Sequence, residues 1–241
     1  MIFDGAQADR CRALCVAAGG AWHNWPLVFD PLRLRRMAAV NADIMIRSVL
    51  LLATFTSFML LGSGFGDLTL AANQILMQFL NITAYALDGF AFAAEAIVGQ
   101  ALGRRSLADL RRGAILTSAW GVAAVLLMAL AFWSFGGAII DLMTTAPEIR
   151  AEARRYLPWM IASPLLGVAA WMLDGIFIGA TRTRDMRNMA LVAVLTYGAA
   201  LAVLLPAFGN HGLWAALMVS FVARGATLWV KYPALERDAA G

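Results

Sequence analysis

Long apolar runs separated by short polar segments dominate the pattern of this chain. Each run approaches or exceeds the ~20 residues that a helix needs to cross a hydrocarbon core ~30 Å thick. A segment in lipid can satisfy its own backbone hydrogen bonds only as a helix. The pattern therefore predicts an all-α membrane protein with six transmembrane helices. The runs are residues 44–61, 70–102, 114–135, 156–180, 189–206 and 213–230.

The same pattern divides the chain into three parts. Residues 1–40 are mixed and polar, so we expect a lead-in that does not span the membrane. Residues 41–232 hold the six-helix lobe, and residues 233–241 form a short tail. The second run is too long to end at the membrane surface, so its helix is expected to project into water.

Composition agrees with lipid as the main solvent of the chain. Hydrophobic residues make up 61% and charged residues 14%, and the mean hydropathy is +0.72. Soluble domains usually carry about 25% charged residues. The net charge of +4 does not indicate a nucleic-acid partner, because the basic residues fall in short groups between apolar runs instead of forming one patch.

The charges of the connecting loops alternate along the chain. The lead-in and the loops after the second and fourth runs are basic, whereas the loops after the first and fifth runs have no Lys or Arg. The loop after the third run is balanced. Because basic loops stay in the cytoplasm, this alternation predicts that both termini are cytoplasmic.

One polar stripe crosses the second predicted helix. Successive members are separated by three, four or seven residues, which places them on one helix face. They are Gln74, Gln78, Asn81, Tyr85, Asp88 and Glu95. A stripe of this kind lines a substrate or ion pathway, or holds neighbouring helices together through hydrogen bonds. For Glu95, solvation near the cytoplasmic surface is a third interpretation.

Three carboxyl groups lie on the predicted transmembrane runs: Asp88 near the middle of the second run, and Glu95 and Asp174 (on the fourth run) toward the cytoplasmic side. A charge at the bilayer centre costs ~2.5–3.5 kcal/mol on insertion scales, so such groups usually serve a function. We see no basic partner at their depth, because Arg47 is one helical turn after Asp43 and that spacing favours a local structural ion pair. We therefore expect Asp88 and Asp174 to face a cavity and to exchange protons.

Other chemistry is not indicated by any motif. The chain has two histidines and no G-x-x-x-x-G-K-[ST] phosphate loop or G-x-S-x-G nucleophile motif. No spacing of His or Cys suggests a metal site. We expect no catalytic residues, no metal and no bound cofactor, so the chain is not predicted to be an enzyme.

Four segments resemble a known transporter family. They are Asn41–Leu50 (NADIMIRSVL), Ala71–Gly103, Leu173–Asn188 (LDGIFIGATRTRDMRN) and Gly209–Trp214 (GNHGLW). They closely resemble the DinF-like branch of the MATE (multidrug and toxic compound extrusion) transporters. Those proteins have twelve helices in two lobes, and this chain resembles the C-terminal six-helix lobe alone.

The resemblance implies export of organic cations or other drugs by antiport against protons or sodium ions. The implied location is the bacterial inner membrane, and the implied partners are the lipid bilayer, a small cationic or apolar drug, and a second copy or a separate N-terminal lobe. A truncated lobe or membrane scaffold that does not transport is the main alternative. A lipid-linked sugar flippase is less favoured, because its cavity should be strongly basic and the polar residues here are acidic.

Overall fold

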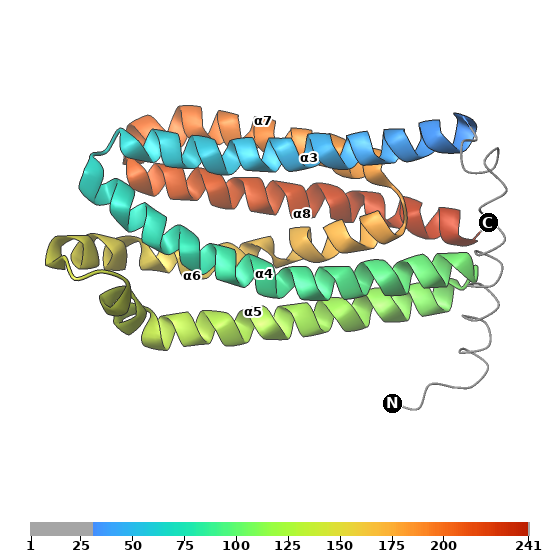
Figure 1. Ribbon diagram of the computed structural model, residues 1–241, viewed down its shortest axis with the longest axis horizontal. Coiled ribbons are helices and arrows are strands. Elements are labelled where there is room, and N and C mark those ends of the chain that lie inside the picture. Colours follow the sequence, from blue (N-terminus) through green and yellow to red (C-terminus); the bar gives the residue numbers. More distant parts are fainter. Residues whose placement is uncertain (1–30, 241) are drawn as a thin grey trace, which may run out of the picture. The chain divides into compact units, whose positions relative to one another are not determined.

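The computed structural model describes residues 31–240, and this part is helical apart from short turns. The chain divides into two compact units, Met1–Ala42 and Asp43–Gly241, and apart from the start of the first helix the features below belong to the second unit. Figure 1 shows the helices in chain order. They are α3 (Pro31–Ser63), α4 (Asp67–Gly103), α5 (Leu107–Met143), α6 (Pro147–Gly179), α7 (Thr183–Phe208) and α8 (Asn210–Ala240).

The predicted fold class is confirmed. Six of the described helices are long and apolar enough to cross a membrane, and each corresponds to one predicted run; only the fourth run, 156–180, passes the end of its helix, by one residue. The helices extend beyond the apolar runs because their polar ends are helical too. Thus α3 begins at Pro31, inside the predicted lead-in, and α4 has 37 residues, a length of about 55 Å. Residues 1–30 of that lead-in lie outside the described part of the chain.

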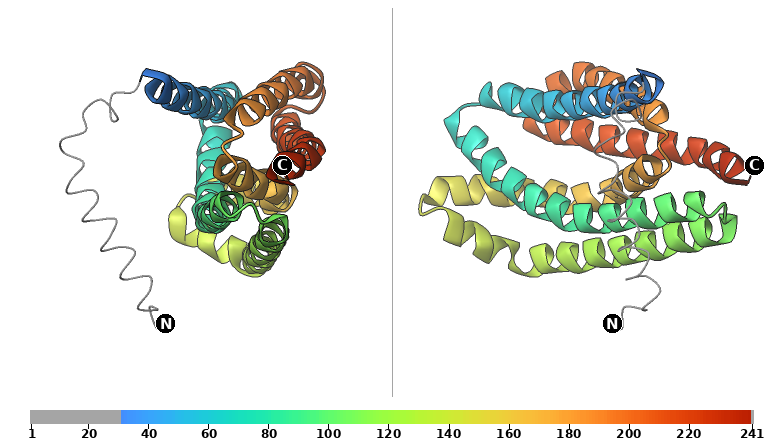
Figure 2. Two further views of the ribbon diagram at one scale, coloured as in Figure 1. Left: turned by 90° about the vertical axis from the view of Figure 1, so that its right-hand side faces the viewer. Right: turned by 45° about the vertical axis from the view of Figure 1, so that its right-hand side comes forward.

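Helix α6 lies in the middle of the second unit. It packs against α4, α5 and α8, while α7 packs mainly against α8. Figure 2 shows α5 and α8 on either side of α6. Every residue from Met172 to Phe177 is buried.

Close contact between α4 and α6 depends on glycine. A Cβ atom on Gly175 would lie 2.3 Å from the carbonyl oxygen of Ala91, and one on Gly179 would lie 2.4 Å from that of Glu95. Any side chain at these positions would push the two backbones apart. The sequence motif Leu173–Gly179 therefore has a packing role in addition to carrying Asp174.

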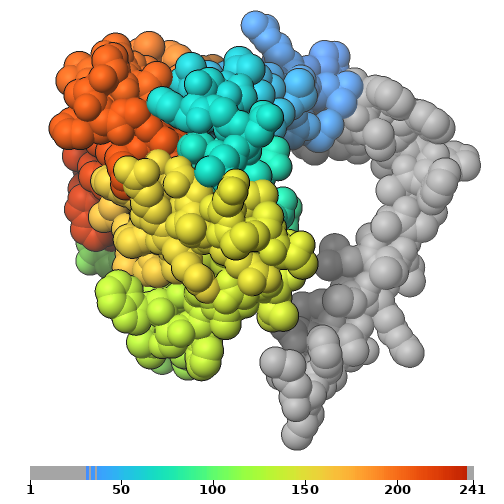
Figure 3. Space-filling view, turned by 90° about the vertical axis from the view of Figure 1, so that its left-hand side faces the viewer, coloured from blue at the N-terminus to red at the C-terminus, as the bar shows by residue number. Residues whose placement is uncertain are grey.

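The turns gather at two ends of the unit. The α4–α5 and α6–α7 turns lie at one end, which we call the basic end because Arg104, Arg105 and Arg182 are in these turns. The α3–α4, α5–α6 and α7–α8 turns lie at the opposite end, which faces the viewer in Figure 3.

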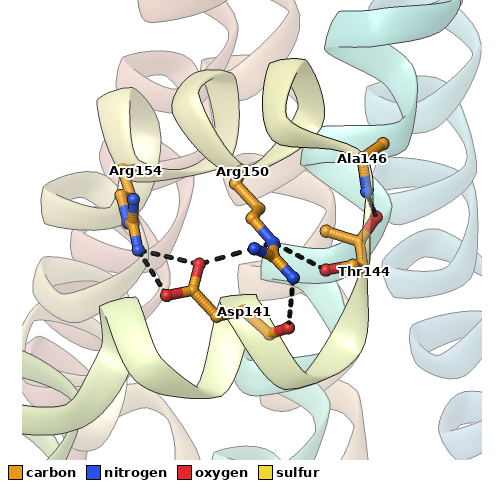
Figure 4. Close-up of polar contacts among 5 residues, drawn as sticks. All are labelled: Asp141, Thr144, Ala146, Arg150 and Arg154. Atoms are coloured by element: carbon orange, nitrogen blue, oxygen red, sulfur yellow. Dashed lines mark hydrogen bonds and ion pairs between the residues drawn. The ribbon is translucent and has the colours of Figure 1, made fainter.

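Two arginines of α6 stabilise the α5–α6 turn at that opposite end through hydrogen bonds (Figure 4). Arg150 donates hydrogen bonds to the carbonyl oxygens of Thr144 (2.8 Å) and Asp141 (2.9 Å), which are left free where α5 ends. Arg154 donates to both carboxylate oxygens of Asp141, at 2.7 and 2.6 Å. Asp141 thus pairs with both arginines, in the loop whose charges the sequence predicted to be balanced as a whole.

Candidate functional site

Asp174 lies at the centre of a buried group of charges. Its side chain is 7% exposed and accepts a hydrogen bond from the Arg47 guanidinium of α3. The guanidinium of Arg224, on α8, lies 3.8 Å from the same carboxylate. Three helices thus contribute to one ionic cluster, which we call the Asp174 cluster (Arg47, Asp174 and Arg224).

Arg224 is the most buried cation of this cluster. Its side chain is 5% exposed, and its guanidinium carbon lies 5.5 Å from the centre of the Trp171 ring and 6.0 Å from that of Phe221. The Nε atoms of Arg224 and of Arg47 have no hydrogen-bond partner in the described part of the chain. Both arginines therefore keep unused hydrogen-bond donors beside Asp174.

Asp88 lies near the cluster but is not held in it. It is half-buried, and it is close enough to Arg47 and Asp174 to interact electrostatically with both. Among the described residues, no Arg or Lys lies within 4 Å of its carboxylate. With both carboxyl groups ionised, two negative charges balance two positive ones, so the charge state of Asp88 decides the net charge of the group.

The ion pairs differ from those predicted from the sequence. Asp43 does not take Arg47 as its partner; it binds Arg187 of α7 at 2.5 Å and accepts a hydrogen bond from Thr183 at 3.2 Å. The expectation that Asp174 has no basic partner at its depth was wrong. The reason is tertiary: each carboxylate finds its arginine on another helix, Asp43 of α3 on α7 and Asp174 of α6 on α3 and α8, which helical spacing alone cannot reveal.

The polar stripe of α4 lies on the side that faces away from the core. Gln74, Gln78 and Tyr85 are exposed, and the other members are half-buried: Asn81, Asp88 and Glu95. The opposite face of α4 is apolar and buried, with Leu76, Leu80 and Leu87 almost completely enclosed. Glu95 lies beside a shallow groove between α4 and α6, next to Gly179.

The exposure of this stripe favours a role in a substrate or ion pathway over a role in holding neighbouring helices together. Side chains that hold helices of one lobe together should be buried between them, but three of the six stripe residues are exposed. Amide and carboxyl groups that face hydrocarbon would be costly. The stripe therefore needs water or another protein surface opposite it.

Two buried polar side chains, those of Arg224 and Asn73, were not predicted from the sequence to have a role. Arg224 is the one Lys or Arg inside the predicted run 213–230, and a permanent charge in such a run is itself a signal. Asn73 is completely buried and joins α4 to α8: it exchanges two hydrogen bonds with Asn210 (2.8 and 3.1 Å) and accepts one from Trp214 (3.0 Å). Nothing in the α4 pattern separates Asn73 from the neighbouring stripe.

The arrangement combines fixed and variable charge. Asp174 is held between two arginines, whereas Asp88 is partly accessible and has no fixed partner. A proton or a cation bound at Asp88 would leave the Asp174 cluster with an uncompensated positive charge. Such coupling between an accessible carboxyl and a buried ion pair suits a site that exchanges cations.

Comparison with known proteins gives consistent matches. Residues 44–204 match the MatE family model. The chain is 46% identical over 198 residues to the DNA damage-inducible protein F of Escherichia coli (strain K12), covering 80% of this chain and 42% of that protein. It is 34% identical over 161 residues to the probable multidrug resistance protein NorM of Pseudomonas aeruginosa, covering 62% and 32%.

Solved structures share the same fold. A mutant of the Vibrio cholerae MATE transporter VcmN matches with a TM-score of 0.82 at 17% identity, covering 93% of this chain and 52% of that one. The same transporter in its bent form matches with a TM-score of 0.79. The chain spans less than half the length of the curated relatives that it matches.

Proposed function

Because this chain belongs to the MATE family of multidrug and toxic compound extrusion transporters, we propose that it provides one six-helix lobe of a cation-coupled exporter. The cargo is an organic cation or an apolar drug, and the driving force is the inward movement of protons by antiport. The observation that carries the proposal is the exposed polar stripe of α4 with Asp88 beside the buried Asp174 cluster.

Asp88 and Asp174 take different roles in this mechanism. Asp88 binds and releases the proton, because it is the partly accessible carboxyl without a fixed ion pair. Asp174 remains paired with Arg47 and Arg224, and protonation of Asp88 changes the electrostatic balance around this cluster. Tyr85, which is 73% exposed, offers an aromatic face to a cationic drug. Gln74, Gln78, Asn81 and Glu95 provide polar contacts along the pathway.

The exposed stripe requires a second surface opposite it. That surface is a separate N-terminal lobe or a second copy of this chain, and the drug passes between the two lobes as they rock. We place the lobe in a bacterial inner membrane with its basic end in the cytoplasm, because the basic turns lie at one end.

Export of a cationic dye from cells that lack their own pumps tests this function. We expect the chain, alone or with a co-expressed N-terminal lobe, to export the dye above the level of an empty vector. A proton uncoupler should abolish this export, whereas removal of sodium ions should leave it unchanged. Sodium-dependent export that survives the uncoupler would contradict proton coupling. Correct membrane insertion without export in both arrangements would favour the non-transporting scaffold.

Substitution of Asp88 tests the coupling site. We expect Asp88→Asn to lower dye export to the vector level with unchanged expression, because an amide cannot exchange a proton. The exposed Glu148 at the opposite end provides the control, since Glu148→Gln removes a carboxyl without touching the stripe. Unaffected export by the Asp88→Asn protein would remove Asp88 from the mechanism.

The buried arginines give the flippase alternative a specific test. Arg47 and Arg224 would suit an anionic phosphate, but both are directed at Asp174 and the exposed stripe contains no basic residue. We therefore expect no translocation of a fluorescent lipid-linked phosphosugar in vesicles that export the dye.

A further inference from the structure

A long apolar groove lies between α5, α6 and α8, away from the α4 stripe. Its volume is about 550 Å³, within the range of small-molecule sites. The floor is made by α6, including Met172 and Ile176, and one wall by α5, including Ile115 and Val122. It is open on the outer side, because α5 and α8 are held apart by α6 and hardly touch each other.

The dimensions of the groove match one leaflet of a bilayer. It follows α5 from Arg111 to Val122, a distance of about 17 Å at 1.5 Å per residue. Half of a hydrocarbon core ~30 Å thick is about 15 Å. An apolar groove of this length, open on its outer side, fits one acyl chain lying along the helix.

The end of the groove carries the marks of a membrane–water interface. Trp229 and Tyr232 of α8 line it there, and their rings stack with centroids 6.0 Å apart. Trp and Tyr are enriched at the level of lipid headgroups. A bound lipid would therefore place its headgroup at this end, and its acyl chain would extend from there into the groove.

Two opposite charges flank the same end. Arg111 of α5 donates two hydrogen bonds of 2.8 Å to the carboxylate of Glu236 on α8. The Arg111 side chain is 56% exposed, and three of the five N–H donors of a guanidinium remain for a phosphate. The Glu236 carboxylate likewise has further acceptor positions for an ammonium group.

We propose that this groove binds a zwitterionic phospholipid with a primary ammonium headgroup, one acyl chain lying in the groove, the phosphate on Arg111 and the ammonium on Glu236. A purely anionic lipid would meet the Glu236 carboxylate at close range. A choline headgroup has no N–H to donate. The bound lipid would bridge α5 and α8, which make little direct contact.

Lipid retention in native mass spectrometry tests the proposal. The purified full chain is incubated with equal amounts of dioleoyl phosphatidylethanolamine, phosphatidylcholine or phosphatidylglycerol, and the bound lipid is counted after detergent removal. We expect retention of phosphatidylethanolamine to exceed that of the other two by about tenfold. This is the loss of affinity expected when a lipid lacks the one hydrogen bond between its ammonium group and Glu236. Equal retention of all three, or a preference for phosphatidylglycerol, would overturn the assignment.

Two variants distinguish binding of the acyl chain in the groove from recognition of the headgroup at its charged end. Ser118→Trp fills the groove and should abolish retention of all three lipids, whereas Glu236→Gln should remove only the preference for phosphatidylethanolamine. Arg112→Gln is the matched control, because Arg112 follows Arg111 in the sequence but does not line the groove. Lipid retention is compared only among variants whose melting temperature equals that of the wild type, so that loss of folding does not explain a loss of lipid. Retention by Ser118→Trp at the wild-type level would show that lipid binds elsewhere.

Discussion

At the scale of single residues, partners decide what each buried polar group contributes. Asp88 and Asp174 look alike in the sequence, since each follows Leu and precedes Gly. In the structure Asp174 is enclosed by two arginines, while Asp88 remains partly accessible. The same side chain is therefore a structural anchor in one place and a candidate exchange site in the other.

Asp174→Asn should strongly destabilise the lobe. Removal of one member of a buried ionic cluster leaves uncompensated charge and typically costs about 3–5 kcal/mol. Denaturant titration in detergent micelles measures the free energy of unfolding. Asp88→Asn is the matched control and should change that free energy by much less, because Asp88 has no fixed ion pair to lose. Equal effects of the two substitutions would contradict this distinction.

Asn73→Leu should also weaken the fold. It leaves the Asn210 amide and the Trp214 N–H without their partner, and each unsatisfied buried group costs about 1–3 kcal/mol. The same titration measures the loss. The adjacent Gln74→Leu serves for comparison, because Gln74 is exposed; a similar loss there would mean that the amide network is not the cause.

At the scale of the elements, α4 and α6 lie in close backbone contact. Gly175 and Gly179 lie one helical turn apart on α6 and bring its backbone against Ala91 and Glu95 of α4. Small residues allow such approach where lipid provides no hydrophobic drive between helices. This contact also sets the distance between the Asp174 cluster and Asp88.

Gly175→Ala should therefore separate α4 from α6 and lower the free energy of unfolding by about 1–3 kcal/mol, the usual cost of overpacking. A Cβ atom on Gly89 of α4 meets nothing within 4 Å. Gly89→Ala should instead be neutral or stabilise the helix by about 0.5–1 kcal/mol. Thermal unfolding of both variants in detergent distinguishes the two outcomes, and tolerance of Gly175→Ala would show that the contact can relax.

At the scale of the whole molecule, the exposed surfaces of the lobe differ in kind. Much of the exposed surface of α5 and α7 is apolar, including Leu127 and Leu195, as suits contact with lipid. The stripe of α4 is polar and includes Gln78. One face of the lobe is thus unsuited to hydrocarbon, and this face is the one we assign to the transport pathway.

Labelling with a water-soluble maleimide tests that assignment. In a background with Cys11→Ser and Cys15→Ser, we expect Gln78→Cys to react in intact membranes, because the pathway admits water. Leu195→Cys, on an exposed apolar surface, should react much more slowly. Labelling both proteins after detergent solubilisation checks that each thiol is reactive. Protection of Gln78→Cys in the membrane would place lipid or a dry protein contact against the stripe.

The sequence by itself determined the membrane class, the six helices and the face of α4 that carries polar groups. These follow from local periodicity and from the length of apolar runs, which depend on neighbouring residues only. The family resemblance likewise needed only local motifs such as LDGIFIGATR.

Tertiary structure decided which charges meet. Arg47 and Asp174 are 127 residues apart, and Asp43 and Arg187 are 144 apart, so no spacing rule within a helix connects them. Arg224 became part of the Asp174 cluster only through the packing of α8 against α6. Burial in low dielectric makes such pairing obligatory, but the choice of partner depends on how the helices are arranged around α6.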